Sequence, residues 1–240
     1  MKQGKPLEVP VRVSVSCLAE LMKSPNRSAE SFESLLRPFK YNRRGEGFAR
    51  SGYYQHALAA IRNYHSHGNA PKVFDAALTE LRGKTAKEKW ERVKYEKNGD
   101  AIEAYRAIYG KRRFRVQTNH RIGYRIGQVV FTAQPDLWVF DEDEGIQVLL
   151  KIGITKKQAS YVDMLLTVMR KAAVSSGYTD IRAKNVLYLN VTTGKEMICE
   201  SGLTRFNRTF AFIARNIAKA WPNVTPPETT SGTKSHAASA

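Results

Sequence analysis

The sequence has 240 residues, of which 42% are hydrophobic and 10% aromatic, enough for a packed core without disulfides or metals. No apolar run approaches the roughly 20 residues that cross a bilayer, and the start lacks the apolar segment of a secretory signal. The net charge of +17 favours nucleic acid as the partner over a membrane, since no long basic amphipathic helix has bulky apolar residues opposite its charges.

Only two cysteines occur in the sequence, Cys17 and Cys199. Two cysteines cannot form the disulfide framework of a small secreted domain. We therefore expect free thiols in a reducing compartment, and we expect the protein to be cytoplasmic.

The first half of the sequence is predicted to be mostly helical. Residues 11–15 alternate apolar and polar side chains, as in a short strand. Apolar side chains at helical spacing then predict helices over residues 16–23, 28–36, 52–64, 72–81, 86–97 and 101–109. The second helix should end at Arg37-Pro38, because proline disfavours the helical conformation in the residue before it. The Asn98-Gly99 pair should separate the last two helices.

The pattern changes to that of strands at Lys111. Strands are predicted over residues 114–122, 124–132, 137–140, 146–154 and 185–192, and helices over 159–173 and 204–221. Four acidic residues and Gly145 should form a solvated turn over 141–145. From Pro222 the composition is that of a disordered tail, residues 222–240. This order predicts an α/β (α+β) fold, with a sheet flanked by helices.

Four short motifs follow one another along the chain, and the third of them is divided between two successive strands. Ser16-Cys-Leu18 through Ser24-Pro25 is followed by Gly52-Tyr-Tyr-Gln-His56. Next come Gln134-Pro135-Asp136-Leu137 and, on the following strand, Val148-Leu149-Leu150-Lys151. Gln158-Ala-Ser-Tyr161 begins the next predicted helix.

In order and context, these motifs resemble the RecB-like branch of the PD-(D/E)XK nuclease superfamily over residues 12–195. The resemblance implies a single domain, residues 1–221, with a restriction-endonuclease-like core. That core is a mixed sheet flanked by helices, and it would carry a helical insertion at about residues 66–110.

The resemblance also implies a site. His56 and Asp136 would be ligands of Mg²⁺ or Mn²⁺, since phosphodiester hydrolysis needs a hard cation that polarises the phosphate and activates water. Lys151 would be catalytic together with Asp136, steadying the attacking water or the phosphate. Gln158 and Tyr161 would contact the DNA or the site.

The sequence departs from the family at the second acidic position. That position is Leu149, and leucine cannot bind a metal. Gln147 shares the strand face but is neutral, and it lies about 13 Å from Lys151 by strand rise. Glu20 could replace the acid from a neighbouring helix, although nothing in the sequence singles it out.

Each of these residues also has an ordinary structural interpretation. His56 could be a buried, hydrogen-bonded histidine, and Asp136 could cap a turn. Lys151 could extend from an apolar strand to water. Gln158 and Tyr161 could be ordinary helix residues. The other histidines, among them His65, are predicted to lie in loops or on the surface.

Two basic clusters are candidate nucleic-acid contacts, since cations bind phosphates and aromatic rings stack on unpaired bases. The first cluster is interleaved with aromatic residues and contains Arg37, Lys40, Arg43, Arg44 and Arg50. The second precedes the predicted sheet and contains Lys111, Arg112, Arg113 and Arg115. The alternative for both is a solvated basic loop.

Three functions remain open from the sequence. The first, which the missing acid favours, is a degenerate nuclease that binds DNA and cleaves it weakly or not at all, with a role in recognition or scaffolding within a larger DNA-processing complex. The second is an active metal-dependent deoxyribonuclease, an exonuclease whose second acid comes from elsewhere. The third is a protein-interaction module of a phage or mobile element that keeps the scaffold alone.

Overall fold

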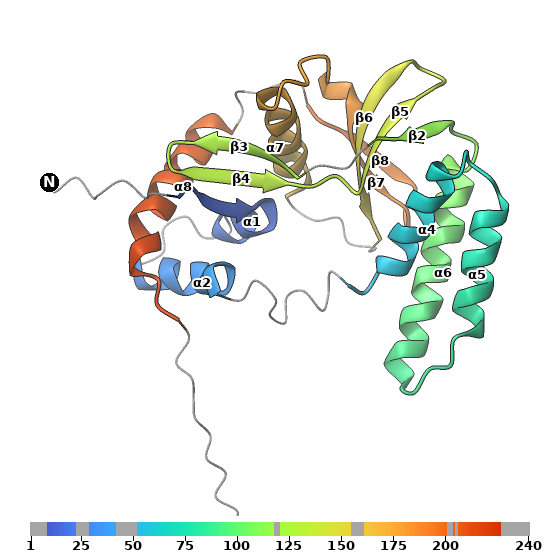
Figure 1. Cartoon of the computed structure of the whole chain (residues 1–240). Helices are drawn as coiled ribbons and strands as arrows, with labels where there is room; N and C mark the ends of the chain where they lie inside the picture. Colours follow the sequence, from blue (N-terminus) through green and yellow to red (C-terminus); the bar gives the residue numbers. More distant parts are fainter. Residues whose placement is uncertain are drawn as a thin grey trace, which may run out of the picture.

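The computed structural model describes residues 9–22, 29–41, 52–117, 121–154, 161–200, 204 and 206–226 (Figure 1). Its elements are, in chain order, β1 (Val11–Ser14), α1 (Val15–Met22), α2 (Ala29–Tyr41), α4 (Gln55–Ser66), α5 (Lys72–Gly83), α6 (Lys89–Tyr109), β2 (Phe114–Val116), β3 (Ile122–Ile126), β4 (Val129–Ala133), β5 (Leu137–Asp141), β6 (Ile146–Gly153), α7 (Val162–Ser175), β7 (Val186–Asn190), β8 (Lys195–Ile198) and α8 (Asn207–Ala220). Among the described helices, none combines the length and apolar character that a membrane span requires.

The strands form two mixed sheets. The smaller has the order β1-β4-β3, with β1 parallel to β4 and β3 antiparallel to it. The larger has the order β2-β5-β6-β7-β8, in which β6 and β7 are parallel and the other neighbours antiparallel. The helix α7 connects β6 to β7, as a parallel pair requires a crossover. The predicted class, mixed sheets flanked by helices, is confirmed.

Alternate residues of the larger sheet enter two different cores, because successive strand side chains point to opposite faces. One core joins the sheet to α1, α7 and α8, and the sheet contributes Trp138, Leu149, Val186 and Tyr188. The other joins it to α4, α5 and α6, and the sheet contributes Leu137, Val148, Leu150 and Leu187. The sheet therefore separates the helical unit α4–α6 from α7 and α8 (Figure 1).

The helix α6 runs unbroken through the predicted boundary at Asn98-Gly99. The Asn98 side chain is buried, where its Oδ1 accepts a hydrogen bond from the Ala57 N–H at 2.9 Å, and its Nδ2 donates to the Tyr53 carbonyl at 2.8 Å. Asn98, which the sequence predicted to lie in a turn, therefore holds α6 to the start of α4. Tertiary hydrogen bonding outweighs its weak helix propensity.

The helix α2 also extends past its predicted end and contains Pro38. The Lys40 ammonium donates to the carbonyls of Trp221 and Val224 at 2.7 and 2.8 Å, and the Tyr41 hydroxyl donates to the Val224 carbonyl at 2.8 Å. These contacts hold the last turn of α2 against the segment after α8. The predicted tail is thus ordered at its start, and Val224 is buried.

The strand boundaries after Lys111 differ from the prediction in two further places. The predicted strand over 124–132 is a hairpin of β3 and β4, which turns at Gly127 with a φ of 56° that suits glycine. The strand β8 was not predicted, because its side chains are mostly exposed and show no apolar alternation. Pairing with β7 defines it.

Candidate functional site

Asp136 and Lys151 lie together at one end of β5 and β6. The register of this antiparallel pair places Leu137 opposite Leu150, so Asp136 falls opposite Lys151. The Lys151 ammonium is 2.8 Å from Asp136 Oδ1, and the backbone N–H of Ile152 donates to Asp136 Oδ2 at 2.8 Å. The sequence placed these residues on adjacent strands, and the structure joins them in an ion pair.

Leu149, at the position where the family resemblance leads us to expect a second acid, lies in the hydrophobic core. The Leu149 side chain is fully buried, in the same cluster as Trp138 and Tyr188. Gln147, which shares this face with Leu149 and Lys151, accepts a hydrogen bond from the Trp138 indole N–H at 3.0 Å. Neither residue offers a carboxylate to a metal beside Asp136.

Tyr188 is a member of the site that the sequence analysis did not identify. It pairs with Lys151 across β6 and β7, and its ring lies over Gly153, where any Cβ would overlap the ring and hydroxyl. Burial raises the pKa of Tyr188, with smaller contributions from Tyr161 and Asp136. The glycine at the end of an apolar strand was the available signal, because a missing side chain there marks a close approach.

Arg62 was also missed, because it lies 74 residues from Asp136 in the sequence. Its guanidinium extends from α4 and donates to the Asp136 backbone carbonyl at 3.0 Å. The side chain is exposed. Arg62, Lys151, Asp136 and Tyr188 are called the Asp136 site below. It combines two cations with one carboxylate, a balance that favours an anionic ligand.

His56 lies on α4 but has its contacts on the side of α6. Its ring meets the Tyr95 ring edge-to-face, with centroids 5.9 Å apart. Burial lowers the pKa of His56, and the charges of Lys84 and Lys94 lower it further. The described residues include no group of three or more His, Cys, Asp or Glu side chains arranged for a metal ion.

The first basic cluster is only partly described. Arg43, Arg44 and Arg50 lie outside the described residues, and Arg37 is half-buried on α2. Lys40 has the structural role given above, and its ammonium also lies 5.6 Å from the centre of the Trp221 ring. Within the described part, Lys40 therefore ties α2 to the segment after α8.

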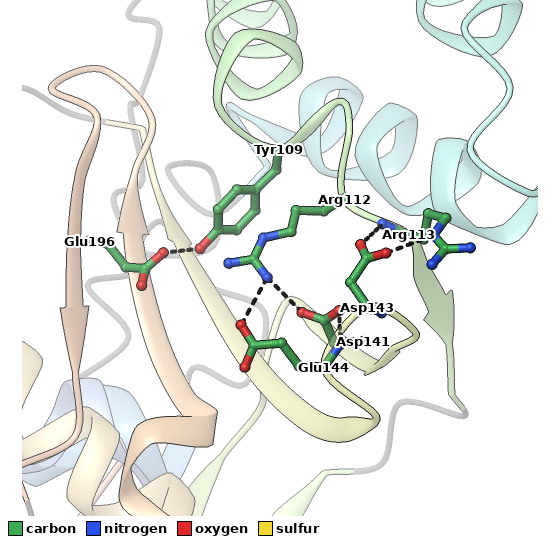
Figure 2. Close-up of polar contacts among 7 residues, drawn as sticks. All are labelled: Tyr109, Arg112, Arg113, Asp141, Asp143, Glu144 and Glu196. Atoms are coloured by element: carbon green, nitrogen blue, oxygen red, sulfur yellow. Dashed lines mark hydrogen bonds and ion pairs between the residues drawn. The ribbon is translucent and has the colours of Figure 1, made fainter.

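The second basic cluster faces the acidic hairpin, residues 141–144, between β5 and β6. Figure 2 shows Arg112 reaching Asp141 and Glu144, at 2.9 and 3.2 Å, and Arg113 reaching Asp143 at 2.7 Å. Arg115 lies 3.7 Å from Glu142. Lys111 is exposed. The turn was predicted, but its acidic side chains pair with arginines.

The Asp141 carboxylate organises this hairpin. Its side chain is only 3% exposed, and its Oδ1 accepts hydrogen bonds from the backbone N–H groups of Asp143 and Glu144 at 3.0 and 3.3 Å. Nearby, the Tyr109 hydroxyl donates to Glu196 of β8 (Figure 2). The end of α6 is therefore held to both the hairpin and β8.

The remaining predicted contacts lie at the start of α7. Tyr161 is the residue before the helix, half-buried against the core that contains Leu149. Gln158 lies outside the described residues, and so does the side chain of Glu20 on α1. Tyr161 is near enough to Tyr188 for its charge to affect the pKa of that residue.

Comparisons with known proteins give no family for this sequence. No protein-family model matches the sequence, and no curated protein matches it significantly.

Proposed function

We propose that this chain is a PD-(D/E)XK-like protein that binds nucleic acid, and that its Asp136 site holds a phosphate without cleaving the phosphodiester bond. The ion pair of Lys151 with Asp136 carries the proposal. It unites the two residues to which the family resemblance gives a catalytic role, at one end of two adjacent strands in a mixed sheet.

The charge balance of the Asp136 site supports an anion as its ligand. The Arg62 guanidinium is exposed, and Lys151 keeps 30% of its side chain exposed, so both can meet a ligand from solvent. A divalent cation would have to compete with the Lys151 ammonium and the Ile152 N–H for the Asp136 oxygens. Hydrogen bonds from cations to phosphate oxygens are strong and need no metal.

We expect no cleavage because Leu149 stands where a second metal-binding carboxylate would be needed. Hydrolysis with a hard metal needs carboxylate ligands that hold it beside the phosphate. The residue at the second acidic position is buried among apolar side chains. His56, the other ligand that the resemblance implies, has its ring against Tyr95, and it belongs to no group of three or more potential metal ligands among the described residues.

Binding and cleavage of labelled single- and double-stranded DNA test the proposal. Lys151→Gln combined with Arg62→Gln should weaken binding about tenfold or more, since each substitution removes a charged hydrogen-bond donor. Lys195→Gln with Arg182→Gln removes two exposed cations elsewhere and is the matched control. Lys151→Arg should keep most of the affinity, and thermal melting of each variant checks its fold.

The cleavage assay is run in Mg²⁺ and in Mn²⁺ beside Asp136→Ala and Lys151→Ala. We expect no cleavage by the wild type. Cleavage that both substitutions abolish would replace the proposal with a working nuclease whose second acid comes from elsewhere. A wild type that binds neither form of DNA would overturn the proposed function itself.

A further inference from the structure

The outer face of α8 carries a stripe of four exposed side chains. Arg208, Phe212, Arg215 and Lys219, called the α8 stripe, recur at helical spacing and therefore share one face. The opposite face is buried in the core through Phe210, Ile213, Ala214 and Ile217. The stripe spans about 16 Å along the helix axis, by the rise per residue.

The charge of this face is not compensated. Between residues 201 and 226 the sequence has four basic residues and no acidic one. Arg208, Arg215 and Lys219 form no ion pair with any residue that the structure describes; the Arg215 Nε instead donates to the Ala211 carbonyl of its own helix at 3.4 Å. The helix lies at the opposite end of the molecule from α5 and α6 (Figure 1).

Phe212 gives this cationic face a flat apolar surface. Its side chain is 45% exposed, whereas the other large apolar residues of α8, Phe210, Ile213 and Ile217, are buried. Several large apolar side chains are exposed in this structure, and Phe212 differs from them as an aromatic ring that lies between two arginines on one helix face. An aromatic ring between cations matches an unpaired base between its phosphates, since bases stack on aromatic rings and phosphates pair with arginine and lysine.

We propose that the α8 stripe is a docking surface for single-stranded nucleic acid, with Phe212 stacking on one base and the three cations contacting the backbone. A duplex hides the faces of its bases, so it would use the cations alone. A lipid surface is disfavoured, because the apolar face of α8 is committed to the core. The inference rests on the proposed function in requiring that the chain bind nucleic acid.

Fluorescence anisotropy with a labelled oligo-dT and with a duplex of equal length tests the stripe. The triple variant Arg208→Gln, Arg215→Gln and Lys219→Gln should reduce the slope of log affinity against log salt for oligo-dT by about 2, given about 0.7 for each lost phosphate contact. Glutamine preserves helix propensity. The control, Lys72→Gln with Arg182→Gln and Lys195→Gln, removes three other exposed cations and should change the slope much less.

Phe212→Ala isolates the stacking contribution. We expect a loss of about 5- to 150-fold in affinity for oligo-dT, with the salt slope and duplex affinity unchanged, since base stacking contributes about 1–3 kcal/mol. Phe212→Leu keeps the apolar character without the ring and should lose almost as much. Heparin, a polyanion without bases, should bind Phe212→Ala as well as it binds the wild type.

Two results would overturn the inference while leaving the proposed function in place. In the first, the wild type binds oligo-dT, and the stripe variant loses no more affinity than the control variant does. The other is Phe212→Ala at wild-type affinity, which would make α8 a surface for polyanions in general, acidic proteins included. A wild type that binds no nucleic acid would remove both proposals together.

Discussion

Basic residues are abundant at two ends of this molecule, but they are used in different ways. Around α5, α6, β2 and the acidic hairpin, cations stand beside carboxylates, with the pairs Arg82–Glu103, Lys84–Glu80, Arg92–Glu96, Arg106–Asp75, Arg112–Asp141 and Arg113–Asp143. On α8, three exposed cations have no carboxylate partner among the described residues. A run of arginines in a sequence is therefore a poor guide to the charge that a partner would meet.

The contrast is clearest at the segment 111–115, which resembles a phosphate-binding cluster in the sequence. The β2–β5 and β5–β6 pairings bring this segment beside the acidic hairpin. Its three arginines face the four carboxylates of the hairpin, which leaves no positive charge in excess for a phosphate, whereas the Asp136 site has two cations for one carboxylate. We therefore assign less nucleic-acid affinity to this segment than to the α8 stripe.

The largest effect should come from the buried carboxylate of the hairpin. Asp141→Ala removes the partner of Arg112 and two hydrogen bonds to the turn, so we expect the free energy of unfolding to fall by about 3 kcal/mol. Asp143→Ala, at an exposed ion pair, should cost much less. Urea denaturation measures both, and equal losses would show that burial does not separate the two carboxylates.

The interior of the helical unit should make stability depend on pH through His65. Although predicted to be in a loop or on the surface, its ring is buried between Tyr105 and Asn69, and burial lowers its pKa to about 4. Below its unfolded pKa of about 6.5, the unfolded chain binds a proton that the folded chain does not. The contribution of His65 to stability is therefore full above that pH and falls as the pH drops toward 4.

Through His65, the free energy of unfolding should fall by about 2 kcal/mol between pH 7 and pH 5. Denaturant titrations of the wild type and of His65→Gln, which cannot titrate, measure it. The free energy of unfolding of the variant should change less steeply with pH over this window, whatever its value at pH 7. Identical slopes would place the acid sensitivity outside the helical unit.

The α8 end contains a buried cation that should have a smaller effect. The Lys171 ammonium lies 4.8 Å from the centre of the Tyr124 ring and donates to Asn207, and burial lowers its pKa. No described carboxylate pairs with it, so Lys171→Met should raise the free energy of unfolding by about 1 kcal/mol. Lys219→Met, at an exposed position, should change little. A loss on Lys171→Met would mean that the ring and amide contacts outweigh desolvation.

The local patterns of the sequence were a good guide where one element determines its own structure. The spacing of apolar residues located α4, α5, α7 and α8, because amphipathic periodicity reports the face that must be buried. The same patterns failed at Asn98 and at Pro38, where partners distant in the sequence override local preference. Missing β8 had a similar cause, since its exposed side chains leave only the pairing with β7 to define it.

By itself, the sequence determined the mixed class of the fold, the large positive charge, and the placement of an aspartate and a lysine on successive strands. Only the tertiary structure decided which cations remain available, because ion pairs depend on register and on packing between segments far apart in the chain. It likewise added Arg62 and Tyr188 to the Asp136 site, one through a helix that lies against the sheet and the other through a parallel neighbouring strand. Side chains meet at a site because backbones are paired and packed, and a one-dimensional pattern records that packing only indirectly.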